Sequence, residues 1–391
     1  MLAAPVVLTD ERSRWRDADW GLIIGALGAS LVGALLVYSA TRSASGTTFL
    51  VRHLLNTGIG LTLALLVMRI PPHVMRAAAP VAYVGGIGGL LAVLGPLGST
   101  INGSRSWIVL PIGLSIQPSE LAKVSVVLAL AALFAGPLDR GERLGPGRLG
   151  LGALLAGLPV LLVLRQPDLG SAAVLAVLAI GMLVVTGIRI RWIALGVVLG
   201  AATAVLLWLS PFLSDYQRDR ITVFLDPQAD PLGIGYQITQ VSIAVSRGGW
   251  TGTGLFEGPS TQGGLIPFQE TDFVFSVAAE ELGYLGALGI LLVYAFLIGR
   301  TVLVGVRGEN AFTHLVAAGV ATWFTAQVVE NVGMNLQLTP VTGLPLPFLS
   351  YGGSSMFACW LAVGMVLSVH LHTRRREGAL RSGRRGAGHV R

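Results

Sequence analysis

The chain is dominated by long apolar runs that alternate with short polar segments. A helix needs about 20 apolar residues to cross the hydrocarbon core of a bilayer. Ten such runs can be recognised, at residues 20–41, 50–69, 74–95, 119–136, 149–164, 169–187, 191–211, 273–299, 311–333 and 351–371. The pattern therefore predicts an all-α integral membrane protein with about ten transmembrane helices.

The composition supports a lipid environment. Apolar residues make up 53% of the chain and charged residues 12%, which is about half the charge of an ordinary soluble protein. So few charges could not cover the surface of a soluble fold of this size. The net charge of +7 comes from short clusters between the apolar runs, which is typical of topology signals rather than of a nucleic-acid-binding surface. The single Cys359 excludes a disulfide framework and a cysteine-based metal site.

The arginines predict how the helices are oriented. If the N-terminus is cytoplasmic, 19 of the 26 arginines fall in cytoplasmic segments, which carry the basic excess in membrane proteins. We therefore expect two cytoplasmic segments, 1–19 and 373–391, around a polytopic membrane domain at 20–372. The first apolar run is long enough to span the bilayer, so it is interpreted as an uncleaved helix. The basic tail after His372 is expected to be disordered and to contact anionic lipid.

Two external loops stand out. Residues 212–271 form a 60-residue loop between spans seven and eight, and structureless loops of that length are uncommon and usually functional. The amphipathic stretch from Ile234 to Val245 predicts short helices on the outer membrane surface. The last external loop, Thr339 to Gly353, is rich in Pro and Gly and is expected to re-enter the protein.

Several charged residues lie where burial is expensive. Lys123, the only lysine, follows Glu120 by three residues in the fourth span, so the two side chains share one helical face. One interpretation is a structural ion pair or a lysine that snorkels to the interface. The other is a polar wall of an outward-facing cavity, since intramembrane ionisable residues are usually functional. Glu280 and Glu281 lie deeper in span eight, and an ion pair with a neighbouring span is the simplest expectation for them.

Asp272 lies where the long external loop meets the eighth span. An Asp directly before an apolar run is a good helix N-cap. Alternatively, desolvation by Phe273 and Phe275 raises its pKa, so that it can serve as a base. Further charged residues map to the same outer side, namely Arg52, Arg105, Asp168, Arg220 and Glu330.

Four motifs occur in register across the ten spans. They are Asn102–Trp107 with Gln117–Lys123, Gln166–Gly170, Thr271–Phe273 with Glu280–Gly283, and Pro345–Ser355. In order, spacing and span count the chain resembles the SEDS proteins (shape, elongation, division, sporulation), represented by RodA, FtsW and SpoVE. The resemblance implies a peptidoglycan glycosyltransferase that polymerises lipid II at the outer face of the bacterial cytoplasmic membrane. It also implies a class B penicillin-binding protein, a transpeptidase, as partner.

The resemblance assigns roles to individual residues. The essential aspartate of the family maps onto Asp272 as the catalytic residue, its polar pair onto Glu120 and Lys123, and a further aspartate onto Asp168. A leaving diphosphate needs cations, and basic residues on the outer side are Arg52, Arg105, Arg220 and Lys123. Ser350, in the last motif, completes the expected substrate-binding set. The sequence shows no cluster of metal ligands, and a divalent cation is the one cofactor left open.

The sequence leaves alternative functions open. The segment Asp230–Tyr236 is more similar to RodA than to FtsW, but Pro267–Glu270 departs from the usual family pattern, so a division-type FtsW role stays open. A flippase for lipid-linked sugars would share the helices and intramembrane charges, although transporters typically show paired repeats and midplane polar sites. A non-catalytic scaffold would give no reason for polar residues gathered on the outer side.

Overall fold

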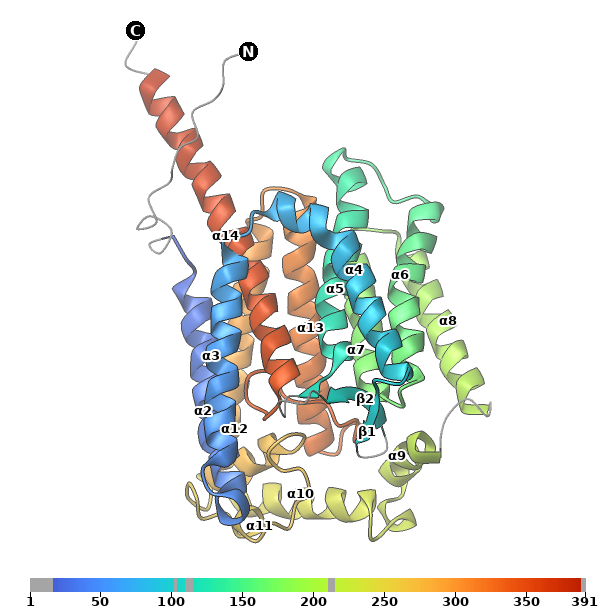
Figure 1. Ribbon diagram of the computed structural model, residues 1–391, viewed down its shortest axis with the longest axis vertical. Helices are drawn as coiled ribbons and strands as arrows, with labels where there is room; N and C mark the ends of the chain where they lie inside the picture. Colours follow the sequence, from blue (N-terminus) through green and yellow to red (C-terminus); the bar gives the residue numbers. More distant parts are fainter. Residues whose placement is uncertain (1–16, 102–103, 110–114, 210–214, 388–391) are drawn as a thin grey trace.

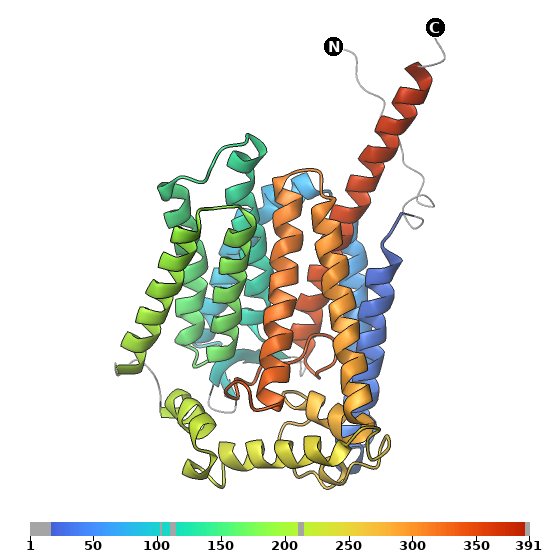
Figure 2. The same ribbon diagram turned by 180° about the vertical axis from the view of Figure 1, so that it is seen from behind.

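The computed structural model describes residues 17–101, 104–109, 115–209 and 215–387. Within these ranges, ten long helices run up and down through one bundle and match the ten predicted spans (Figures 1 and 2). They are α2 (Trp20–Ser45), α3 (Thr48–Met68), α4 (Pro72–Leu94), α5 (Pro118–Asp139), α6 (Pro146–Leu164), α7 (Leu169–Val185), α8 (Ile190–Leu209), α12 (Val274–Val306), α13 (Ala311–Asn335) and α14 (Gly353–Ala387). Eight of them are long and apolar enough to cross a membrane, and α7 and α8 complete the set. The protein is a multi-pass membrane protein, as predicted.

The helix boundaries follow from local sequence signals. Proline opens α4, α5 and α6, where its missing N–H costs no helical hydrogen bond. Asp19 caps α2 by accepting the Leu22 amide at 3.2 Å, and Asn310 forms a capping box with Thr313 at the start of α13. The ten predicted spans begin within a few residues of the observed helices, whereas α12 and α14 end later than predicted, at Val306 and Ala387.

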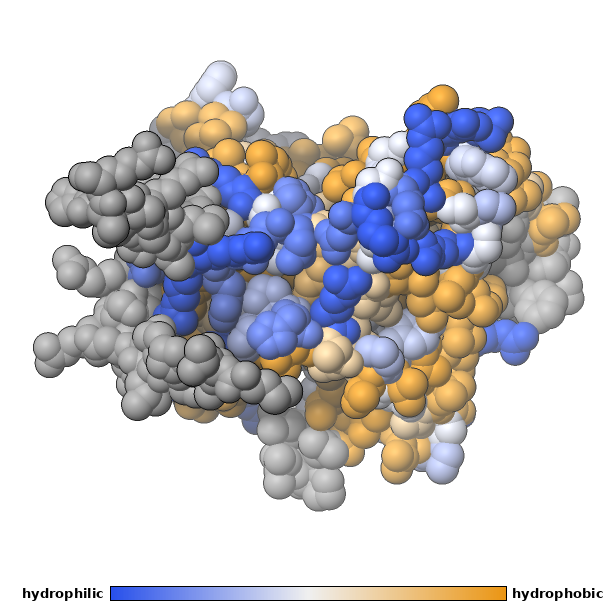
Figure 3. All heavy atoms as spheres, turned by 90° about the horizontal axis from the view of Figure 1, so that it is seen from above, coloured by the Kyte–Doolittle hydropathy of each residue, from blue (hydrophilic) through white to orange (hydrophobic). Residues whose placement is uncertain are grey.

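The start of α2 and the end of α14 lie at the same end of the bundle (Figure 1). Hydrophilic side chains gather over that end (Figure 3). There Arg300 of α12 donates to Asp19 at 2.6 Å and ties α12 to the beginning of α2. The expectation of a disordered basic tail is wrong, because α14 continues as a helix to Ala387. Extending an existing helix avoids the cost of nucleation, and Arg, Ala, Leu and Glu are good helix formers.

The opposite end is covered by the long loop, which forms short helices as predicted (Figures 1 and 2). They are α9 (Asp215–Leu225), the 3₁₀ helix η1 (Pro227–Ala229), α10 (Ile234–Gly248) and α11 (Pro259–Gln262). The amphipathic α10 buries Ile238, Val241 and Ala244 in a small core with Phe273 and Met334. These loop helices, from α9 to α11, are packed against the ends of α12 and α13 and are called the outer layer after their predicted position.

The segment between α4 and α5 contains three short strands that the hydrophobic pattern does not predict. They are β1 (Ser99–Ile101), β2 (Ser104–Val109) and β3 (Ser115–Ile116), antiparallel in the order β1-β2-β3. Trp107 pairs with Ser99, and Ile108 with Ile116. Strands this short carry too few alternations to be recognised against an apolar background.

The last external loop re-enters the protein, as predicted. Leu349 lies against α2 so closely that a Cβ added at Gly33 would be 2.5 Å from the Leu349 carbonyl oxygen. Phe348 packs between Phe324 and Trp360, with ring centroids 5.6 Å from each. The loop is thus held at the depth of the helices rather than above them.

Helix α12 is broken at Gly283, whose φ of +68° is left-handed. The interruption leaves backbone groups on both sides without helical partners, and residues 249–254 pair with them. Thr253 and Gly254 donate to the carbonyls of Glu280 and Glu281 at 2.9 and 3.1 Å, and Tyr284 donates to the Gly249 carbonyl at 2.9 Å. The loop therefore replaces one turn of helical hydrogen bonding.

Glu280 and Glu281 do not form the expected ion pairs with a neighbouring span. The Glu280 carboxylate accepts the backbone amides of Ser260 and Thr261, each at 2.8 Å, at the start of α11. Glu281 accepts the Ser39 hydroxyl at 2.6 Å and the Gln262 amide at 3.0 Å. Neutral donors contact both carboxylates because the break in α12 brings the loop beside them.

Replacing Gly283 by alanine should destabilise the protein. A left-handed non-glycine residue costs roughly 1–2 kcal/mol, and the added Cβ would lie 2.2 Å from the Gly252 nitrogen. We expect a lower melting temperature in detergent, measured by tryptophan fluorescence. Gly289→Ala in the same helix is the control, since a Cβ there meets nothing within 4 Å. Equal melting temperatures for both variants would contradict the assigned role of the break.

Candidate active site

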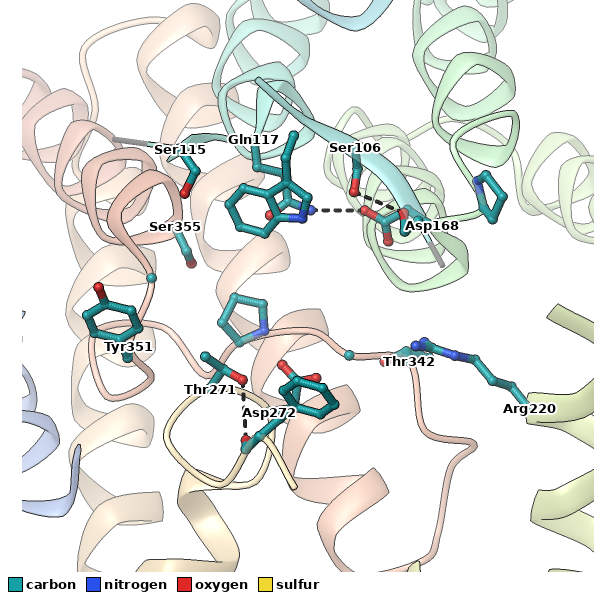
Figure 4. Close-up of a pocket in the computed structure, with 17 residues that line it drawn as sticks. Ser106, Ser115, Gln117, Asp168, Arg220, Thr271, Asp272, Thr342, Tyr351 and Ser355 are labelled. Atoms are coloured by element: carbon teal, nitrogen blue, oxygen red, sulfur yellow. Dashed lines mark hydrogen bonds between the residues drawn. The ribbon is translucent and has the colours of Figure 1, made fainter. Parts of the chain in front are cut away.

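A cavity of about 300 Å³ lies at the end of the bundle covered by the outer layer. Figure 4 shows Thr271 and Asp272 on one side, Gln117, Ser106 and Asp168 facing them, and Arg220 reaching in from α9. The complete lining is Ser104, Ser106, Trp107, Ser115, Gln117, Pro167, Asp168, Arg220, Phe268, Thr271, Asp272, Thr342, Gly343, Pro345, Tyr351, Gly352 and Ser355. Most of these residues come from non-helical segments between the spans.

Asp272 presents a half-buried carboxylate to this cavity. It lies in a turn in which its amide donates to the Phe268 carbonyl at 3.0 Å. Desolvation raises its pKa to about 6, and the positive charge of Arg220 and a hydrogen bond from Thr271 oppose that rise. The alternative role as a helix cap is wrong, because α12 begins after Phe273 without a side-chain cap. The carboxylate is therefore available for chemistry at neutral pH.

Arg220 and Asp272 meet at Gly343, whose φ is +73°. A Cβ at this glycine would lie 3.3 Å from Asp272 Oδ2 and 3.5 Å from both terminal nitrogens of Arg220. Any larger residue would occupy the space between the two charged groups. The glycine thus keeps a gap open in which a reacting group can contact both the carboxylate and the guanidinium.

Asp168 lies on the facing wall. One of its carboxylate oxygens accepts the Ser171 amide at 2.9 Å and thereby caps α7, and the other accepts the Gln117 side chain at 3.2 Å. The backbone N–H of Gln117 in turn donates to the Ser354 hydroxyl at 2.9 Å. These bonds join the starts of α5, α7 and α14, so Asp168 organises the wall while its side chain faces the cavity.

The rest of the lining is rich in hydroxyl groups, which both donate and accept hydrogen bonds and so suit a polyhydroxylated ligand. Ser104 donates to the Gln166 carbonyl at 2.6 Å and pairs with Ser106 at 2.9 Å. Site prediction from the sequence missed these residues, together with Ser115, Gln117, Thr342, Tyr351 and Ser355. The motif assignments contain several of them, such as Gln117 and Ser355, but only the folded chain brings them together.

Five of the seven predicted substrate-binding residues do not line the cavity, namely Arg52, Arg105, Glu120, Lys123 and Ser350. Arg105 is exposed and donates to the Gly95 carbonyl at 2.8 Å, and Arg52 is exposed on α3. Ser350 is buried, and its hydroxyl accepts the Leu346 amide at 2.7 Å inside the re-entrant loop. Charge on the outer side is therefore a poor guide to the cavity, because side chains on that side point in several directions. Glu330 borders a separate apolar groove on α7, α12 and α13.

The interpretation of Glu120 and Lys123 as a wall of the cavity is wrong. Both side chains are fully buried, and their ammonium and carboxylate groups pair at 2.7 Å below the cavity. The Lys123 ammonium also donates to Gln327 at 3.0 Å and lies 5.4 Å from the Trp323 ring. A charge in this position is tolerated only because each group is paired and hydrogen-bonded.

Among the described residues, no group of three or more His, Cys, Asp or Glu side chains is arranged to hold a metal ion. Two carboxylates, Asp168 and Asp272, nevertheless line the same cavity. The arrangement as a whole offers a base, a cation and many hydroxyl groups around one opening. It suits the transfer of a sugar from a phosphorylated carrier.

Comparison with known proteins identifies the family. The sequence model of the FtsW, RodA and SpoVE family, described as "Cell cycle protein", matches residues 20–375. The chain belongs to this family. It is 37% identical to the peptidoglycan glycosyltransferase MrdB of Escherichia coli K12 over 87% of this chain and 91% of MrdB. It is also 37% identical to a probable peptidoglycan glycosyltransferase FtsW of Coxiella burnetii, over 92% and 97% of the two chains.

Solved structures agree with this assignment to the FtsW, RodA and SpoVE family. The rod shape determining protein RodA of Thermus thermophilus is similar with a TM-score of 0.67 and 31% identity, over 91% of this chain and 97% of RodA. A chain from a peptidoglycan synthase complex, described as coordinating polymerization and crosslinking, has a TM-score of 0.76 and 34% identity, over 91% and 98% of the two chains. These relatives confirm the predicted enzyme class, peptidoglycan glycosyltransferase.

Removing one member of the buried ion pair should be more damaging than removing both. Glu120→Ala leaves the Lys123 charge unpaired, which costs about 3–5 kcal/mol in buried pairs. We expect a large fall in melting temperature for this variant. The double variant Glu120→Leu/Lys123→Met should recover much of that loss, since Trp323 still donates to Gln327 at 2.6 Å. A double variant less stable than Glu120→Ala would refute this account.

Proposed function

We propose that this protein polymerises lipid II into glycan strands, with Asp272 as the general base. The observation that supports the proposal is a desolvated carboxylate that faces a hydroxyl-rich cavity beside an arginine. Asp272 accepts the proton of a sugar 4-hydroxyl as that oxygen attacks the anomeric carbon of the second substrate. The bond from that carbon to the polyprenyl diphosphate breaks, and the diphosphate leaves with the bonding electrons.

Arg220 is the proposed partner of the leaving diphosphate. Its guanidinium lies across the Gly343 gap from Asp272, so a donor bound there contacts the cation while the attacking hydroxyl contacts the base. Guanidinium groups bind phosphate oxygens through paired hydrogen bonds, which favours Arg over a simple point charge. Arg52 and Arg105 stay candidates for guiding the anionic lipid, in positions outside the cavity.

The wider setting belongs to the same proposal. The outer layer and the cavity face the outside of the cytoplasmic membrane, and both termini are cytoplasmic. A class B penicillin-binding protein crosslinks the product, in line with the complex to which the chain is similar. We favour a role in cell elongation like that of RodA, with division of the FtsW type as the alternative. Relatives of both kinds support the shared chemistry.

Asp272→Asn should abolish polymerisation while the protein stays folded. The amide keeps the size of the side chain but cannot accept the proton, and a general base typically contributes at least about 100-fold to the rate. Polymer formation from lipid II by the purified protein, analysed by gel electrophoresis, is the measurement. Asp226→Asn is the matched control, because Asp226 caps η1 in the outer layer and does not line the cavity. Polymerisation by Asp272→Asn at a normal rate would exclude the base role.

The rate should fall as the pH decreases through about 6, since protonated Asp272 cannot accept a proton. The Arg220 charge lowers the Asp272 pKa, so Arg220→Gln should move this acid limb to higher pH. The measurement is the pH dependence of kcat/KM for lipid II, which reports the pKa of the free enzyme. A limb that stays in place in Arg220→Gln would mean that another group titrates.

The transport alternative has its own readout. A flippase moves fluorescent lipid II between leaflets of a vesicle without forming polymer, whereas the proposed enzyme forms polymer from substrate in detergent, where no leaflets exist. Measuring both activities on one preparation separates the two functions.

A further inference from the structure

Three amide side chains follow one face of α13 at four-residue spacing, namely Gln327, Asn331 and Asn335. All three are buried, with exposed fractions of 0%, 0% and 1%. Unpaired amides are costly inside a membrane bundle, so their partners reveal what they do. Each of them donates to a carbonyl of a segment that borders the cavity.

Asn331 is the centre of this row. Its nitrogen donates to the Asp272 carbonyl at 2.9 Å and to the Leu344 carbonyl at 2.7 Å, which uses both of its N–H groups. Leu344 directly follows Gly343, the residue at the gap between Asp272 and Arg220. One amide group therefore joins the backbone of the base to the opposite edge of the gap.

The two flanking amides extend the same connection. Asn335 donates to the Asp272 carbonyl at 3.2 Å, and its oxygen accepts the Ser276 amide in the first turn of α12 at 3.0 Å. Gln327 donates to the Pro345 carbonyl at 2.7 Å. Its oxygen accepts from Lys123 at 3.0 Å, so the buried ion pair is linked to the cavity segment.

We infer that Gln327, Asn331 and Asn335 are positioning residues that set the distance between Asp272 and the Gly343 segment during glycan transfer. Three observations carry this inference. The turn that bears Asp272 has no side-chain cap of its own. Two of the amides meet at its carbonyl. Asp272 and Pro345, to which the row donates, line the cavity, as does Gly343 next to Leu344. The inference rests on the proposed base role of Asp272, which its own variant tests separately.

The experiment compares Asn331→Ser, Asn335→Ser and Tyr83→Phe in the purified full-length protein. Serine at 331 keeps one donor, so it cannot hold both carbonyls. The control Tyr83→Phe removes a bond of similar kind, from a tyrosine to the Leu155 carbonyl at 2.9 Å, between spans away from the cavity. Initial rates of lipid II polymerisation give kcat and KM, and melting temperatures report stability.

We expect Asn331→Ser to lower kcat by about 10- to 100-fold with KM changed less than about threefold, since a small misplacement of a reacting group is costly. Asn335→Ser should have a smaller effect in the same direction, because Asn331 still holds the Asp272 carbonyl. Tyr83→Phe should leave both constants unchanged even if its melting temperature falls as far.

The fall of kcat/KM at low pH, the acid limb, is a further measurement, and a purely structural role of the asparagines would leave its position unchanged. Asp272 is faced by the charges of Arg220, Glu270 and Asp168. If Asn331→Ser lets the base move away from Arg220, the limb shifts to higher pH. Wild-type kcat and limb in both asparagine variants, with Asp272→Asn inactive, would overturn the inference alone. An active Asp272→Asn would instead overturn the proposed function.

Discussion

The architecture depends on pairing backbone groups wherever the chain leaves helical geometry inside the bundle. A membrane supplies no water to satisfy a free N–H or C=O, so irregular segments survive only when protein groups replace the missing bonds. The break at Gly283 is satisfied by the loop at 249–254. The re-entrant loop is satisfied by side chains such as Tyr294, whose hydroxyl donates to the Pro347 carbonyl. Both irregular segments border the outer end, which is where the cavity forms.

The cavity follows from this arrangement. A bundle of unbroken helices would fill its interior with side chains and leave no polar opening. Here five non-helical segments meet, at residues 104–107, 115–117, 167–168, 268–272 and 342–352, and each brings backbone groups that hold polar side chains in place. The buried ion pair of Glu120 and Lys123 belongs to the support of this region rather than to its surface. Gln327 links the pair to the cavity lining, because it accepts from Lys123 and donates to the Pro345 carbonyl.

The length of the apolar runs was sufficient to predict the ten helices, because each run is long and is bounded by charge, Pro or Gly. The apolar runs do not predict the short strands at 99–116 or the helical tail. Of the predicted site residues, Asp272, Asp168 and Arg220 line the cavity, whereas Arg52, Arg105, Glu120, Lys123 and Ser350 do not. Sequence position gives the side of the membrane but not the direction of a side chain. The sequence does not predict a role for the asparagines of α13, because their partners are backbone carbonyls, which every residue has.

The contact of Ser39 with Glu281 also bears on the order of assembly. These residues are separated by 242 positions, and Gln269 donates to the Ala40 carbonyl across 229. During synthesis, six further helices are therefore inserted before the partners of this end of the first helix have been made. The long-range bonds of that end can form only when residues 256–281 have left the ribosome. The active cavity is consequently among the last parts of the molecule to be completed.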